Sequence, residues 1–282
     1  MARLPLKPTA VLGVVREMRA AAEDFAPLLV AGAPATAKRL VEALGAGAEL
    51  AAVRDLSAGE PVRYDLEGAE VMVYAIEGEG PSEADVKVLR LADRLDVELV
   101  CVLVREPRGE PVDVPYVLAT DVVAVAPGQE LPLDTIAERI AGRAGDSSYK
   151  LAARVPTLRR PICERIVRGI SRQNGILSVA VFIPGADFPV LTLNQIRMVL
   201  RIAAAYGEEI DGERALELLP VVGAGLGFRA LAHNVVGFVP GLGWAVQGAI
   251  AFTGTRALGE AAIAYFESGT PAKVKEYVRS RS

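Results

Sequence analysis

Residues 26–44 read APLLVAGAPATAKRLVEAL: a short apolar run, a glycine, and then apolar residues that recur with helical spacing. This pattern predicts a strand that passes through a turn at Gly32 into a helix. Further along, the apolar runs EVMVYAI (70–76) and ELVCVLV (98–104) predict strands buried on both faces, and residues 82–95 between them predict a helix with Ser82 as its N-cap. This alternation indicates an α/β domain with a mostly parallel sheet.

Weaker signals extend the α/β pattern in both directions. The expected additional elements are a helix at 9–23, strands at 49–53, 116–119 and 122–126, and a helix at 133–144. We therefore expect an N-terminal helix within residues 1–24 and an α/β domain at 25–145.

The turn in the first segment resembles a phosphate-binding P-loop. That loop has the pattern G-x-x-x-x-G-K-[ST] between a strand and a helix, because its backbone amides surround phosphates and its hydroxyl holds Mg²⁺. Gly32 and Lys38 have the required spacing and context, but Ala37 replaces the second glycine and Arg39 replaces the hydroxyl. The segment predicts a residual phosphate or anion site at Gly32, Thr36 and Lys38. The alternative is an ordinary strand–helix turn beside a solvated lysine.

Other residues needed for GTP chemistry are absent from their expected places. Arg39 puts a cation where the metal ligand belongs, and phosphoryl transfer without Mg²⁺ loses its main charge stabiliser. The guanine-reading N/T-K-x-D pattern should follow residues 98–104, where the chain reads REPR. A D-x-x-G pattern occurs at residues 65–68, ahead of the strand it should follow. We expect no hydrolysis, no catalytic residue, no metal and no required cofactor. Binding of GTP in a nonstandard way is the alternative.

The second half of the chain differs in charge and in pattern. Residues 1–149 carry 15 Lys and Arg against 25 Asp and Glu, a net −10, whereas residues 150–282 carry 16 against 10, a net +6. Strand patterns stop, and Thr192 with Gln195 predicts a capping box at the start of a helix. We expect an all-α domain at 150–282.

A basic segment opens that domain at residues 150–172, and an apolar run follows at 176–184. This combination is typical of a surface attracted to anionic lipid or to an acidic partner, and the equal alternative is a solvated helix face that packs on the acidic N-terminal domain. Nucleic acid is not expected, because the chain is acidic overall and few aromatics lie among the arginines. The residues predicted to make the contact are Arg159, Arg160, Arg165, Arg168 and Arg172.

An apolar, glycine-rich region extends over residues 218–255, and residues 230–255 contain no charged side chain. Pro240 and Gly241 divide it, which predicts two short helices that either insert in a membrane as a hairpin or pack in a soluble core or homo-oligomer. The N-terminus shows no signal-peptide pattern. We expect a cytoplasmic protein, either peripheral or hairpin-inserted at the inner membrane.

The C-terminal third resembles the YcjF-type domain of unknown function. The motifs that carry the resemblance are PGADFP (184–189), LT (191–192), QIRMV (195–199), FVPGLGW (238–244), ALG (257–259) and AYFE (264–267). Members of that family are bacterial and are often predicted to contact the inner membrane. They are often fused to, or encoded beside, Era-like GTPase domains, and the family has no established enzymatic activity.

The resemblance therefore implies a degenerate Era-like GTPase domain joined to a helical YcjF-type domain. We expect a non-catalytic pseudo-GTPase that acts as an interaction or scaffold protein. Two alternatives remain: a nonstandard nucleotide switch, and a soluble homo-oligomeric helical bundle.

Overall fold

The chain forms two compact units, each described by itself below. The computed structural model describes residues 8–21, 25–106, 112–180, 188–208 and 243–269. The α/β unit comprises Asp24–Ile162, and the helical unit comprises Met1–Glu23 with Cys163–Ser282.

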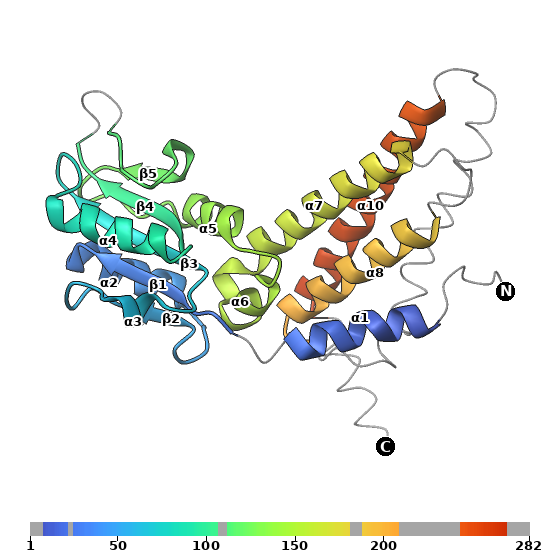
Figure 1. Ribbon diagram of the computed structural model, residues 1–282, viewed down its shortest axis with the longest axis horizontal. Helices are drawn as coiled ribbons and strands as arrows, with labels where there is room; N and C mark the ends of the chain where they lie inside the picture. The colour runs from blue at the N-terminus through green and yellow to red at the C-terminus, as the bar shows by residue number, and fades with distance from the viewer. Residues whose placement is uncertain (1–7, 22–24, 107–111, 181–187, 209–242, 270–282) are drawn as a thin grey trace. The chain divides into compact units, whose positions relative to one another are not determined.

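The α/β unit is built on a five-stranded parallel sheet with the strand order β2-β1-β3-β4-β5 (Figure 1). Every observed strand pair is parallel. The prediction of an α/β fold with a parallel sheet is therefore confirmed. The strands are β1 (Leu28–Gly32), β2 (Val53–Asp55), β3 (Val71–Glu77), β4 (Glu98–Val104) and β5 (Val122–Val125).

Both faces of the sheet are buried, which explains why the central strands are continuous apolar runs. Side chains alternate between the faces, so Leu29, Met72 and Cys101 belong to a core that α4 covers. Their neighbours, such as Val30 and Val73, are equally buried toward the opposite face, where α2 and α5 pack. The helices and short 3-10 turns of this unit are α2 (Pro34–Leu44), α3 (Arg63–Leu66), α4 (Glu83–Arg94), η1 (Ala119–Asp121), α5 (Leu133–Arg143), α6 (Tyr149–Arg154) and η2 (Pro156–Leu158).

The N-terminus of α4 has the predicted cap. The Ser82 hydroxyl accepts a hydrogen bond from the Asp85 amide at 3.2 Å, and the Ser82 amide donates to Asp85 Oδ2 at 2.7 Å. This reciprocal pair satisfies two amides that a helix leaves without partners. Asp85 also accepts from the Tyr74 hydroxyl at 2.9 Å, which fixes α4 to β3.

Two of the weaker strand predictions need correction. Residues 116–119 do not form a strand: Tyr116 has a φ of 67°, which breaks an extended chain, and η1 begins at Ala119. The strand expected at 49–53 lies later, at Val53–Asp55, because the apolar alanines before it occupy a turn.

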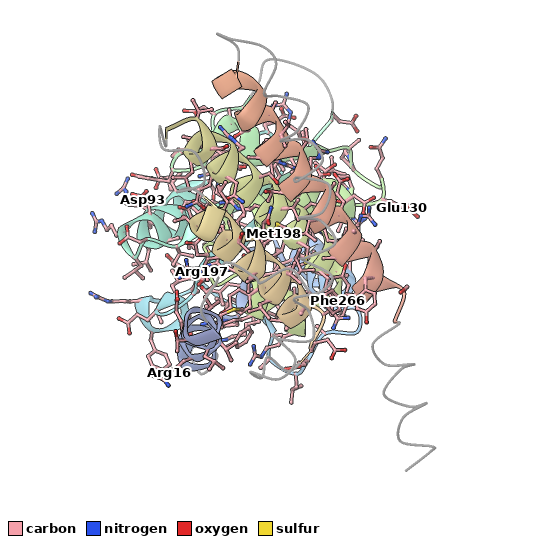
Figure 2. The ribbon with its side chains drawn as sticks, turned by 90° about the vertical axis from the view of Figure 1, so that its right-hand side faces the viewer. Arg16, Asp93, Glu130, Arg197, Met198 and Phe266 are labelled. Carbon is pink, nitrogen blue, oxygen red and sulfur yellow. The ribbon has the colours of Figure 1, made fainter. Side chains whose placement is uncertain are left out.

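The described residues of the C-terminal region are helical. The helices of the helical unit are α1 (Pro8–Ala21), α7 (Arg159–Ala180), α8 (Phe188–Ala205) and α10 (Gly243–Glu267), and α7 belongs to this unit from Cys163 onward. The predicted capping box at Thr192 is wrong, because α8 begins at Phe188 and Thr192 lies buried within it. Arg197 on α8 donates to Glu17 on α1 at 3.3 Å (Figure 2).

A polar network lies inside the helical unit. Thr255 Oγ1 on α10 accepts hydrogen bonds from Asn174 on α7 and Gln195 on α8, both at 3.0 Å. Asn194 donates to Asn174 Oδ1 at 2.9 Å. All four side chains are buried, so the network joins three helices at one level of the core.

Residues 218–242 of the predicted apolar hairpin lie outside the described residues, and residues 243–255 form the first part of α10. None of the described helices combines the length and the apolar character that crossing a membrane requires.

Candidate functional site

The strand order defines where a ligand would bind in the α/β unit. The chain leaves β1 toward β2 on one side and later returns to β3 on the other side of β1. In doubly wound sheets, ligands bind at such a switch point, outside the carboxyl ends of the two strands. Here those ends are Gly32 and Glu77, and Gly32 is one of the three residues predicted for the anion site.

The turn after β1 is very short. Gly32 ends the strand and Pro34 begins α2, which leaves only Ala33 between them. Gly32 has a φ of 97°, and a Cβ built on it would lie 2.1 Å from the Ala75 carbonyl oxygen of β3. The Ala33 amide donates to that same oxygen at 2.8 Å. Only glycine fits at position 32, and the amide that follows it is already used inside the sheet.

The predicted site residues are only partly brought together. Gly32 and Thr36 both lie at the start of α2, and Thr36 is buried, with 2% of its surface exposed. Lys38 is exposed. Because Lys38 follows Thr36 by two residues, about 200° around the helix, the two side chains leave α2 on different sides.

A carboxylate lies where a phosphate would be expected. Thr36 Oγ1 donates a hydrogen bond of 2.6 Å to Glu77 Oε1 at the end of β3. The first turn of α2 contains no acidic residue, and its N-cap, Ala33, makes no side-chain cap. Glu77 therefore supplies negative charge near the positive end of the helix dipole, the position that would attract an anion.

The residue in the metal-ligand position is also engaged. Arg39 donates to the Gln129 carbonyl oxygen at 2.8 Å, which ties α2 to the loop after β5. Asp55, at the end of the neighbouring strand β2, accepts hydrogen bonds from the amide and the hydroxyl of Ser57. Across the described residues, His, Cys, Asp and Glu form no group of three or more that could hold a metal ion.

Glu77 was not predicted as a site residue, although a signal for it existed. It directly follows a buried apolar strand, and the carboxyl ends of adjacent parallel strands share one edge of the sheet. The pairing with Thr36 joins residues 41 positions apart, which no local pattern reveals. The D-x-x-G pattern at residues 65–68 has a structural role instead, because Asp65 accepts from the Val62 amide at 2.9 Å at the start of α3.

The buried titratable groups of the sheet favour their neutral forms. Cys101 is fully buried, and burial together with the charge of Asp85 raises the pKa of its thiol to about 12. Burial, with the hydrogen bond to Asp85, also raises the pKa of Tyr74 far above its ordinary value. A thiol in this environment is a core residue rather than a nucleophile.

The five arginines of the predicted contact surface fall into two groups. Arg159, which belongs to the α/β unit, donates to the carbonyl oxygens of Ala152 and Ala153, and Arg160, the next residue, is exposed. Three others are exposed on α7 at positions i, i+3 and i+7, and therefore share one stripe of the helix. These are Arg165, Arg168 and Arg172, which we call the α7 arginine row. Ile176 continues the stripe with 68% of its surface exposed.

The fold and site define a doubly wound α/β unit joined to a helical unit. No protein-family model, no curated protein and no solved structure matches the chain.

Proposed function

We propose that this protein is a non-catalytic pseudo-GTPase joined to a helical YcjF-type domain, and that it acts as an interaction or scaffold protein. The observation that carries the proposal is the one-residue turn between Gly32 and Pro34. A P-loop needs several non-helical residues whose amides point at the phosphates. Here residues 34–37 are already helical, and Glu77 stands at the helix end.

The geometry of the substituted residues supports the absence of phosphoryl transfer. Arg39 holds a loop carbonyl instead of a metal ion. Lys38 lies in the second turn of α2, beyond the turn that would face a ligand, and its side chain is exposed. A bound nucleotide would therefore lack both the Mg²⁺ and the positioned lysine on which this chemistry depends. Release of phosphate from GTP or ATP with Mg²⁺ is expected to equal the rate without protein.

The α7 arginine row supports an interaction role. Three exposed cations on one stripe, followed by exposed Ile176, suit an anionic membrane surface, at about 1 kcal/mol for each cation near the lipid. An acidic protein partner is the second candidate for the same row, because both would be attracted by the same charges.

Flotation with vesicles distinguishes the two candidates for the α7 row. The full chain is expected to float with vesicles that contain anionic phosphatidylglycerol at low salt, and to float less at high salt. The double variant Arg168→Glu with Arg172→Glu should remain at the bottom, whereas the matched control Arg16→Glu with Arg139→Glu should float. Absence of flotation by the unchanged chain at low salt would remove the membrane from the proposal and leave the acidic partner.

A further inference from the structure

A groove of about 330 Å³ lies on the α/β unit beside α4, and its lining includes none of Gly32, Thr36 and Glu77. Its lining combines one side of α4 with the segment that precedes α3. We call this surface the α4 groove, and its lining includes Glu60, Pro61, Lys87, Arg90, Leu91 and Arg94.

The α4 groove is positively charged on a negatively charged unit. The α/β unit carries 15 Lys and Arg against 23 Asp and Glu, a net −8. Lys87, Arg90 and Arg94 are nevertheless exposed along one stripe of α4 at positions i, i+3 and i+7. Among the described residues, no carboxylate lies within ion-pair distance of Lys87 or Arg94. These two cations are therefore available for a negatively charged partner.

Exposed apolar side chains accompany the residues that line the groove. Val62 follows Pro61 of the groove and Tyr64 lies in the first turn of α3, with 59% and 82% of their surfaces exposed. Tyr116, which contacts Arg90 of the groove, has 43% of its surface exposed, and Leu118 has 58% exposed. Exposed aromatic residues beside arginines are the composition that marks protein interfaces.

Tyr116 is held beside the groove. Arg90 Nε donates to the Tyr116 hydroxyl at 2.9 Å, and the guanidinium carbon lies 5.9 Å from the centre of the ring. Tyr116 also has a φ of 67°, an unusual conformation for an aromatic residue. The contact with Arg90 restrains the exposed ring, which lowers the side-chain freedom that binding would remove.

We propose that the α4 groove binds an acidic, aromatic- or leucine-containing peptide segment of a partner protein. Lys87 and Arg94 are seven residues apart, about 10 Å along the helix. An extended peptide rises about 3.3 Å per residue, so two carboxylates three residues apart reach both cations. Apolar residues of such a peptide would contact Tyr116, Val62 or Tyr64.

A random twelve-residue peptide library, selected against the immobilised full chain, tests this proposal. Selected peptides are expected to be enriched in Asp and Glu together with aromatic residues or Leu. A synthetic copy of one selected acidic peptide, labelled with fluorescein, is then titrated with the full chain. The double variant Lys87→Glu with Arg94→Glu should bind it at least about tenfold more weakly, because charge reversal turns attraction into repulsion. The matched control Arg16→Glu with Arg139→Glu should bind unchanged.

Four outcomes would overturn the inference. The first is a selection that yields no acidic peptides. The second is equal binding by the Lys87→Glu/Arg94→Glu variant, and the third is loss of binding only when the α7 arginine row is reversed. A single-stranded oligonucleotide or an anionic vesicle that binds through Lys87 and Arg94, where the peptide does not, would also reject the peptide as the occupant. None of these outcomes depends on whether the chain binds nucleotide.

Discussion

The hydroxyl of Thr36 donates a 2.6 Å hydrogen bond to the carboxylate of Glu77, and so joins the start of α2 to the end of β3. This contact occupies the switch point of the sheet, where doubly wound proteins bind their ligands. The carboxylate provides internally the negative charge that a bound phosphate would otherwise supply to the helix end. We therefore expect the contact to stabilise the fold as well as to occupy the position of a ligand.

Glu77→Ala is expected to lower the free energy of unfolding by about 1 kcal/mol, through loss of the hydrogen bond and of the charge near the helix end. Urea denaturation followed by far-UV circular dichroism measures this change in the free energy of unfolding. Glu79→Ala is the matched control, since Glu79 is exposed two residues later, and it should change stability by less than about 0.5 kcal/mol. A double-mutant cycle with Thr36→Val that gives no coupling energy would show that the contact does not stabilise the fold.

Thr255→Val should destabilise the helical unit by about 2 to 4 kcal/mol, because the amides of Asn174 and Gln195 would lose a shared buried acceptor. Urea denaturation followed by far-UV circular dichroism, to which the helices contribute most, measures the loss of unfolding free energy. Thr253→Val provides the control on the same helix: Thr253 is exposed and bonds only to carbonyls of the preceding turn. Similar losses of unfolding free energy in Thr255→Val and Thr253→Val would contradict a stabilising role for the buried network.

Gly259→Ala and Gly254→Ala test the packing of α10 as a pair. A Cβ at Gly259 would lie 2.4 Å and 2.7 Å from the Val167 methyl groups and 3.1 Å from the sulfur of Met198, which Figure 2 labels on α8. Overpacking should lower stability by about 1 to 3 kcal/mol. At Gly254 nothing lies within 4 Å, so alanine should raise stability by up to about 1 kcal/mol through helix propensity. A loss of stability in both variants, or a gain in both, would contradict the close approach of Gly259 to Val167.

The sheet should lose stability in alkaline solution, and Cys101 should account for part of the loss. The folded thiol keeps its proton to a pKa of about 12, whereas the unfolded thiol loses it near 9.0. The stabilisation is therefore complete below pH 9 and declines as the pH rises toward 12, with a slope of about 1.4 kcal/mol per pH unit for one group. Tyr74 adds to the slope above its ordinary value of 10.0.

Cys101→Ala should give a shallower decline between pH 9 and 10, measured as urea unfolding free energies at several pH values. The comparison uses slopes, so the stability that the variant loses at neutral pH does not affect it. Equal slopes in the two proteins would mean that the thiol titrates alike in the folded and unfolded chains.

The central strands of the sheet could be predicted because their signal is local. β3 and β4 are buried on both faces and therefore read as unbroken apolar runs. Residues 116–119 have a similar apolar composition, but Tyr116 and Leu118 are exposed, and sequence alone does not distinguish an exposed apolar residue from a buried one. At Thr192 the capping pattern was present, yet α8 begins earlier and Thr192 is buried in the helix core.

The candidate site shows the same division between local and distant signals. Gly32 was predicted from its place between a strand and a helix, and its φ of 97° agrees with that role. Neither the pairing of Thr36 with Glu77 nor that of Arg39 with Gln129 could be predicted, because each joins segments that only the folded sheet brings together. The length of the turn after β1 was also missed, since the P-loop pattern does not indicate where the helix begins.

Isothermal titration of the full chain with GTP and with ATP, each with and without Mg²⁺, tests the central claim most directly. The closed turn at Ala33 and the carboxylate of Glu77 predict no binding heat at nucleotide concentrations up to the millimolar range, and no change on adding Mg²⁺. Micromolar binding that Lys38→Ala abolishes would contradict the account and assign the α/β unit to the nucleotide switches.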